Sequence, residues 1–513
     1  MSEQAKKQET NNRQIAKNSL FLYIRTAITM IIALYSSRVV LKELGVENYG
    51  IYNVVGGVIA LLSSLSGTLA GSTQRYITFA LGKNDNDYLR KIFSTSLRIH
   101  FYLALVILVI AETAGLWFLG NKINLPEGRF FAASIVFQFS LLGFLFNTMT
   151  IPFESAVIAK EQFKFYAMID VTRAILRLSL VLCIGLLPYD PLIVYACIEL
   201  LMMIFYRGMF IVFTKRNFKG IGYTKEKDKE LSSEIMRFTG WNFMGTVSSI
   251  FYEQGSSILL NIYYGVFLNA AMGVTNQVRG AVNTFISNFT VAVNPQITKS
   301  YAQNNYERSN YLMFLGSKIA ASLLFIIGFP LILNLDYILD LWLVEVPEYA
   351  SSFILLSLLA LLLATFTIPF NCLMFATGRI KYYQISSVII NVSGILALYL
   401  SFEYNLGPLV IFYVLIIQST LKIIVLLYMA RRATQFPVSA YMSKVLLKVI
   451  VICLLIASTL YFKQQYLPET DFIMFAIESI VCLVLTFSIV ILFVLNSNER
   501  NSVFAILKNR IRK

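Results

Sequence analysis

The chain is a succession of long apolar stretches separated by short polar segments. Each stretch has about 20 residues or more, the length that a helix needs to cross a hydrocarbon layer of about 30 Å. This pattern predicts an all-α integral membrane protein with about fourteen transmembrane helices. The predicted spans are residues 19–40, 49–79, 97–119, 132–152, 165–187, 192–213, 241–263, 270–293, 311–333, 353–372, 385–404, 409–429, 445–462 and 472–495.

Basic side chains gather in alternate polar segments. They precede the first predicted span and follow each even-numbered one, whereas the intervening segments carry few Lys or Arg. Because short cytoplasmic loops carry an excess of Lys and Arg, this alternation predicts that both termini are cytoplasmic. We expect no cleaved signal peptide, because the first apolar stretch is too long for one.

One stretch occurs twice. Residues 150–166 read TIPFESAVIAKEQFKFY and residues 367–383 read TIPFNCLMFATGRIKYY, and the two share seven of seventeen positions. A fainter match pairs Gly45-Val46 with Gly265-Val266. Spans one to six therefore correspond to spans seven to twelve, the parallel-repeat arrangement of some transporters. The predicted organisation is an N-lobe (1–214), a basic cytoplasmic linker (215–238), a C-lobe (239–430), and two extra helices with a basic tail (431–513).

Composition agrees with this class. Hydrophobic residues make up 57% of the chain, charged residues 14%, and the mean hydropathy is +0.68. The net charge of +15 lies mostly in loops, where it orients the protein, so we expect no nucleic-acid partner. Five cysteines at no motif spacing and a lone His100 predict neither a disulfide framework nor a metal site. We expect no cofactor and a monomer.

Four arginines lie away from the ends of predicted spans and are candidate ligands for an anionic substrate: Arg25, Arg173, Arg177 and Arg279. A charged side chain in the membrane needs a partner or a water-filled cavity, so each marks a candidate site. Structural alternatives stay open, since Arg25 and Arg173 can also snorkel or pair with an acid. For Arg98, nearer a helix end, snorkelling to headgroups is the favoured interpretation.

Intramembrane acids are candidates for coupling transport to H⁺ or Na⁺: Glu253, Asp170 and Glu199. For Asp170 the favoured alternative is that it only neutralises Arg173. Pro152 and Pro369, in the repeated stretch, are candidate hinges, but simple helix termination at each proline is the preferred interpretation.

The sequence resembles the polysaccharide (O-antigen type) flippases of the multidrug/oligosaccharidyl-lipid/polysaccharide exporter superfamily. The resemblance is concentrated in residues 18–85, especially the LGVENYGIY turn at 44–52, and in the two proline-containing stretches. It implies two six-helix lobes that open alternately to either side. The implied substrate is an undecaprenyl-diphosphate-linked oligosaccharide, carried from the cytoplasmic to the outer leaflet of a bacterial inner membrane for surface polysaccharide synthesis. Membrane lipid and other polysaccharide-assembly proteins are the implied partners.

Three other classes remain open, one of which is a non-transporting assembly scaffold that only a flux assay excludes. A multidrug exporter of the same fold would need an aromatic or acidic cavity for cationic drugs, and the candidate arginines argue against it. A membrane-embedded glycan polymerase or transferase would need a large outer loop or an acidic cluster, and the loops are short and mostly basic. No glycine-rich nucleotide loop is evident, which favours a secondary transporter over an ATP-driven one, and a non-enzyme.

Overall fold

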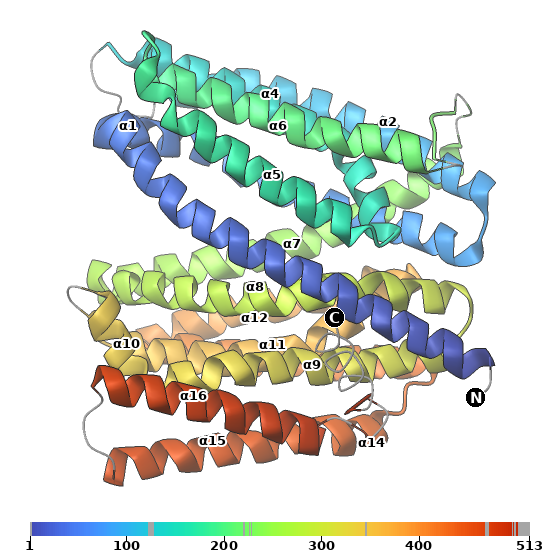
Figure 1. The fold of residues 1–513 in the computed structure, drawn as a ribbon, viewed down its shortest axis with the longest axis vertical. Helices are drawn as coiled ribbons and strands as arrows, with labels where there is room; N and C mark the ends of the chain where they lie inside the picture. Colours follow the sequence, from blue (N-terminus) through green and yellow to red (C-terminus); the bar gives the residue numbers. More distant parts are fainter. Residues whose placement is uncertain are drawn as a thin grey trace, which may run out of the picture. The chain divides into compact units, whose positions relative to one another are not determined.

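The computed structural model describes residues 3–121, 128–218, 221–224, 226, 228–343, 346–466, 471–494, 496 and 499–500. Helices and turns are the only regular elements in these ranges, with no strand among them (Figure 1). Nine helices of this part of the chain are long and apolar enough to cross a membrane. Four of the remaining predicted spans lie within α1 (Glu3–Lys83), α7 (Lys229–Tyr264) and α8 (Val266–Ala302), and the span 165–187 covers most of α5 (Phe163–Leu182) and the short η2 (Ile184–Leu186). Every predicted span therefore falls on helix. The predicted all-α membrane fold is confirmed.

The chain forms two compact units. The N-unit comprises Asn18–Phe243, and the C-unit comprises Met1–Lys17 with Met244–Lys513. The boundary between them falls inside one helix, α7 (Lys229–Tyr264). The finer division into lobes, linker and C-terminal pair stays a prediction.

In the N-unit, α4 is the central helix: it packs along both α6 and α2. Its buried face includes Val136, Phe137 and Leu141, which belong to the apolar core of the unit. The elements are α1 (Glu3–Lys83), α2 (Asn86–Ile110), η1 (Ala111–Gly115), α3 (Leu116–Asn121), α4 (Phe130–Ala159), α5 (Phe163–Leu182), η2 (Ile184–Leu186) and α6 (Pro191–Asn217), followed by the first turns of α7.

In the C-unit, α11 takes the place that α4 has in the N-unit, since it packs against α8, α9 and α13. The later α16 packs along α9 (Figure 1). The elements after α7 are α8 (Val266–Ala302), α9 (Tyr306–Leu333), α10 (Leu335–Trp342), α11 (Ala350–Thr377), α12 (Lys381–Glu403), α13 (Val410–Thr434), α14 (Val438–Tyr441), η3 (Met442–Leu446), α15 (Leu447–Tyr466), α16 (Phe472–Ile489) and η4 (Val490–Val494).

The repeat seen in the sequence is also present in the backbone. Gly45 kinks α1 with φ 75° and ψ 166°, and Gly265 precedes α8 with φ 80° and ψ −174°. Only glycine adopts this region readily. At the next turn of each unit, Asn84 and Asn304 have φ of 56° and 55°. Two weakly similar sequences thus encode the same breaks between helices.

Both repeated prolines lie inside helices. Pro152 precedes the end of α4 at Ala159, and Pro369 precedes the end of α11 at Thr377. The interpretation that these prolines end their helices is therefore wrong. A membrane helix tolerates proline because neighbouring helices and Ser/Thr side chains satisfy the freed backbone groups. The role of the two prolines as hinges stays a prediction.

An ion pair holds the start of α6 to the start of α4. Arg129 Nη1 lies 2.6 Å from Asp190 Oδ2, and Arg129 Nη2 also donates to Asn48 Oδ1. Asp190 caps α6 by accepting from the backbone N–H of Leu192 at 2.9 Å. Partial burial raises the pKa of the Asp190 carboxyl, but the hydrogen bonds from Arg129 and Leu192 lower it by more, so its pKa lies below the usual 3.8.

Gly45 and Gly265 have similar, positive φ angles. Replacing either of them, by Gly45→Ala or Gly265→Ala, is expected to destabilise the protein by about 1–3 kcal/mol, because a residue with a Cβ is strained at these dihedral angles. Unfolding in mixed SDS–detergent micelles measures the change. Gly273→Ala is the control, since Gly273 is helical and a Cβ there meets nothing within 4 Å. Equal behaviour of all three variants would contradict the strain argument.

The Asp190 pair should make stability depend on pH at the acid end. A depressed pKa means that the ionised carboxylate stabilises the fold above the unfolded pKa of about 3.9, and that this contribution is lost as pH falls further. The difference in apparent melting temperature between wild type and Asp190→Asn should therefore be constant from about pH 5 to 7 and shrink below about pH 4. A pH-independent difference would be inconsistent with this assignment.

Candidate functional site

Charged side chains from four helices meet within the N-unit and define what we call the N-unit network. Three of the seven were predicted from the sequence to bind substrate and two to couple to an ion. Its members come from α1, α4, α5 and α6: Arg25, Glu154, Asp170, Arg173, Arg177, Glu199 and Arg207.

Arg25 on α1 forms an ion pair with Asp170 on α5, at 3.1 Å between Nη1 and Oδ2. The Arg25 guanidinium also lies over the ring of Tyr166, 5.2 Å from its centroid. Asp170 was expected to neutralise Arg173 alone; Arg173 does interact electrostatically with it, but the partner within ion-pair distance is Arg25 from a different helix. The pair joins two helices that are far apart in the sequence.

Arg177 on α5 pairs with Glu199 on α6 through its Nε, and its Nη2 donates to the Tyr195 hydroxyl at 2.7 Å. The Tyr195 ring in turn packs edge-on against Tyr52 of α1, with centroids 4.7 Å apart. The cation predicted to be deepest in α5 is therefore held by a carboxylate, a phenol and the aromatic packing behind it.

Arg173 differs from its neighbours. Its guanidinium lies 4.9 Å from the ring centroid of Tyr206, and no described carboxylate lies within ion-pair distance of it. Arg207 flanks the same ring at 5.3 Å, but pairs with Glu154. Four arginines against three carboxylates leave the network with one surplus positive charge.

The sequence analysis missed the Arg207–Glu154 pair. Arg207 lies beyond the middle of α6, and Glu154 lies in the part of α4 that follows Pro152. Arg207 lies six residues from the end of the predicted span 192–213 (213 − 207), the same depth at which Arg25 was selected in the span 19–40 (25 − 19), so the sequence could have indicated it. Glu154 was hidden by the wrong expectation that α4 ends at the proline.

The C-unit contains a polar cavity of about 210 Å³ between α7, α8, α12 and α13, which we call the C-unit cavity. Its lining includes Arg279 and Glu253, which were predicted from the sequence as site residues, and Lys422, which was not. The remaining lining residues are Ser249, Tyr252, Ser256, Ser257, Met272, Asn276, Asn391, Ile411, Phe412, Leu415 and Gln418.

A hydrogen-bonded chain orients Lys422. Its Nζ donates to Asn391 Oδ1 at 2.9 Å, and Asn391 Nδ2 donates to the hydroxyls of Ser248 and Ser249 at 2.9 and 3.2 Å. Gln418 Nε2 donates to the carbonyl of Ile390 at 2.8 Å. These contacts hold the Asn391 and Gln418 side chains in place, and the hydrogen bond from Nζ gives Lys422 a defined position.

Gln418, one of the residues that line the cavity, also has a buried polar atom: its Oε1 makes no hydrogen bond within the described part of the chain. A buried polar atom without a partner costs about 1–3 kcal/mol.

The cations of this cavity are not neutralised by ion pairs. Neither Arg279 nor Lys422 has a carboxylate within 4 Å among the residues that the structure describes. Glu253 lines the same cavity, is exposed on the surface of the C-unit, and interacts electrostatically with Arg279. Two cations and one carboxylate leave a surplus positive charge here as well. The arrangement can bind an anion.

Lys422 could have been predicted as a site residue from the sequence. It lies near the middle of α13, in a predicted span with no other charge between residues 409 and 429. The prediction of a basic site at depth named four arginines and missed this lysine. The roles predicted for Arg25, Arg173, Arg177, Arg279, Glu253, Asp170 and Glu199 remain predictions.

No protein-family model and no curated relative matches the sequence. The fold, however, is similar to solved structures of MATE transporters. An outward-facing multidrug resistance MATE family transporter of the MOP superfamily has a TM-score of 0.72 at 15% identity, covering 83% of this chain and 97% of that chain. MATE in the bent conformation has a TM-score of 0.72 at 16% identity, covering 84% and 97%.

A third similar structure is a MOP superfamily transporter from Pyrococcus furiosus Vc1 (DSM3638), in which reverse polarity of the binding pocket suggests a different function. Its TM-score is 0.69 at 16% identity, covering 84% of this chain and 96% of that chain. At these identities the similarity establishes the fold: the chain has the multi-pass membrane fold of MATE transporters.

The Arg177–Glu199 pair provides a test of the N-unit network. Arg177→Ala leaves a partly buried carboxylate unpaired and is expected to cost about 1–3 kcal/mol, less than a fully buried pair because water screens it partly. Removing both partners should cost less than the sum of the single changes, by about 1 kcal/mol or more. Reversible unfolding in SDS–detergent micelles gives the four stabilities of the cycle.

Arg173→Ala is the matched control for this cycle, because it removes an arginine from the same helix without unpairing a carboxylate. It should cost less than Arg177→Ala. Strict additivity of the Arg177 and Glu199 changes would contradict the pairing.

Proposed function

We propose that this protein is a secondary transporter, a flippase that moves a lipid-linked, diphosphate-containing oligosaccharide from the cytoplasmic to the outer leaflet of a bacterial inner membrane. The substrate class is undecaprenyl-diphosphate-linked oligosaccharide for surface polysaccharide synthesis. Both termini lie in the cytoplasm. The protein works as a monomer, alongside other polysaccharide-assembly proteins.

The single observation that carries this proposal is the surplus of positive charge in the C-unit cavity. A diphosphate cannot enter hydrocarbon unaided, because moving such a charge into a medium of low dielectric costs tens of kcal/mol. Arg279 and Lys422 offer basic hydrogen-bond donors that have no ion-pair partner in the described residues. Charge-assisted hydrogen bonds to phosphate oxygens are about twice as strong as neutral ones.

The size of the cavity indicates that it binds only one part of the substrate. At about 210 Å³ it is smaller than the 300–1,000 Å³ typical of sites that enclose a whole ligand. It suits a compact anionic group such as a diphosphate. The glycan and the polyprenyl chain therefore lie outside it.

Energy coupling fits the same cavity better than the N-unit network. Asp170 and Glu199, two of the three candidate coupling acids, are each held in an ion pair. Glu253 is exposed and has no ion-pair partner among the described residues. Glu253 is thus the acid that can accept a proton, or contact a Na⁺ ion, without first breaking an ion pair.

A second candidate function is multidrug export. The similar structures include a multidrug resistance MATE family transporter, and Glu253 supplies the negative charge that a cationic drug would need. The two functions differ in what the cavity's cations do: they attract a diphosphate and repel a cationic drug.

Charge removal in the cavity separates the two functions. In a bacterial strain that lacks its own flippase, the double variant Arg279→Gln/Lys422→Gln should lower surface polysaccharide about tenfold or more, because each lost charged hydrogen bond contributes about 1.5–3 kcal/mol. Lys422→Arg should retain display. Efflux of a cationic dye should be absent in wild type.

Arg379→Gln is the matched control, because Arg379 is an exposed cation of the C-unit outside the cavity. Its display should equal that of wild type, with membrane insertion measured for every variant. A wild-type level of surface polysaccharide in the double variant would contradict the cationic site. Dye efflux by wild type that increases on charge removal would favour the multidrug exporter instead.

A further inference from the structure

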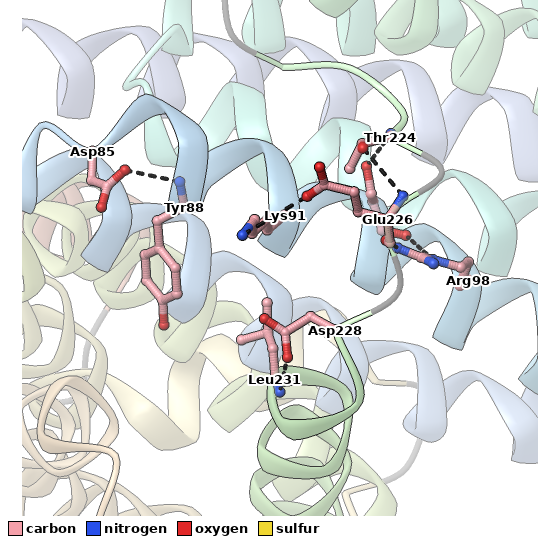
Figure 2. A network of polar contacts seen from close by, with 9 residues as sticks. Asp85, Tyr88, Lys91, Arg98, Thr224, Glu226, Asp228 and Leu231 are labelled. Atoms are coloured by element: carbon pink, nitrogen blue, oxygen red, sulfur yellow. Dashed lines mark hydrogen bonds and ion pairs between the residues drawn. The ribbon is translucent and has the colours of Figure 1, made fainter.

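The connection between α6 and α7 is tied to α2 in the N-unit. Ser94 on α2 donates to the carbonyl of Gly222 at 3.0 Å and accepts from the backbone N–H of Thr224 at 2.7 Å. Arg98, one turn further along α2, donates through Nη2 to the carbonyl of Glu226 at 2.5 Å (Figure 2). These contacts hold the described part of the connection against the helix.

The start of α7 is held in place as well. Asp228 caps the helix by accepting from the backbone N–H of Leu231 at 2.8 Å (Figure 2). One turn later, Glu234 accepts from the hydroxyl of Tyr76 on α1 at 3.0 Å. The first turns of α7 are therefore anchored to α1.

The two helices enclose a groove of about 410 Å³, which we call the α2–α7 groove. Its α2 side follows a single helix face, because the lining residues recur at spacings of three and four. The lining residues are Thr95, Arg98, Ile99, Tyr102, Leu103 and Val106 on α2, and Asp228, Lys229, Ser232 and Met236 at the start of α7.

The groove is amphipathic along its length. Arg98, Lys229 and Asp228 carry its charges, whereas Leu103, Val106 and Met236 line it without polar atoms. On α2 the apolar surface continues beyond the groove, where Val109 and Ile110 are 63% and 52% exposed. A polar headgroup site thus leads into an open apolar face.

The charged part of the groove is net positive. Arg98 is oriented by the backbone carbonyls of Ser94 and Glu226, and neutral carbonyls leave its charge uncompensated. The Glu226 carboxylate lies instead 3.8 Å from Lys91 Nζ. Lys229 is exposed, and Asp228 is the one carboxylate among the lining residues. Two cations against one acid favour an anionic occupant.

We propose that the α2–α7 groove binds an anionic phospholipid of the surrounding bilayer. Its phosphate lies between Arg98 and Lys229, and one acyl chain lies over Leu103, Val106 and the exposed face of α2. The predicted span begins at residue 97, so Arg98 lies at the level of the headgroups, where long basic side chains meet lipid phosphates. The site is separate from the C-unit cavity and does not depend on the transported substrate.

Native mass spectrometry of the full chain, purified in detergent with added phosphatidylglycerol or phosphatidylcholine, tests this site. Wild type should retain phosphatidylglycerol preferentially. Lys229→Gln should weaken its retention about fivefold, as expected for one cation at an anionic lipid surface, and Arg98→Gln/Lys229→Gln should weaken it further. Val106→Ser should weaken both lipids equally.

Lys91→Gln is the matched control: Lys91 is a cation of the same helix, paired with Glu226, outside the groove. It should leave retention unchanged. Because Arg98→Gln also removes a hydrogen bond of the connection, Lys229→Gln alone carries the charge test. Equal retention of both lipids by wild type, or an unchanged Lys229→Gln, would overturn the proposal. Displacement of phosphatidylglycerol by equimolar polyprenyl diphosphate would assign the groove to the transported lipid and overturn it too.

Discussion

The high cost of an unpaired charge in hydrocarbon is the constraint on which the N-unit depends. An arginine inside a membrane helix must find a partner or water, and here three of the four find a carboxylate on another helix. Arg25–Asp170 joins α1 to α5, Arg177–Glu199 joins α5 to α6, and Arg207–Glu154 joins α6 to α4. Charge pairing therefore fixes helix positions that apolar packing against lipid would leave poorly specified.

The same cost applies to the charged side chains that lack an ion pair, so their presence needs an explanation. The Arg173 guanidinium lies over the ring of Tyr206, and Arg279 and Lys422 line a cavity without an ion-pair partner among the described residues. A membrane protein retains such costly groups where they contact a ligand. The excess is positive in both units, and this charge is the basis on which we propose a diphosphate-containing substrate. Fold similarity alone does not choose between these substrates, because it is shared by transporters of different function.

The helices could be predicted because the hydrocarbon thickness dictates their length. The repeat could be predicted because the same break between helices needs a glycine in each unit, Gly45 and Gly265, and so leaves a match in the sequence. Which arginine pairs with which carboxylate could not be predicted in this way. Asp170 was assigned to Arg173 because the two are close on one helix, but Arg25, 145 residues away in sequence, is the ion-pair partner. Such contacts depend on tertiary packing. Pro152 misled for a related reason, since neighbouring helices support the backbone that proline interrupts. Lys422, by contrast, could have been predicted as a site residue, because it lies near the middle of α13.

Translocation by the purified protein in proteoliposomes tests the central claim most directly. The measurement follows a short-chain polyprenyl diphosphate carrying a labelled saccharide from one leaflet to the other. The account predicts translocation by wild type, and competition by inorganic pyrophosphate at the cationic cavity. Absence of translocation, together with transport of a cationic dye by the same proteoliposomes, would contradict it.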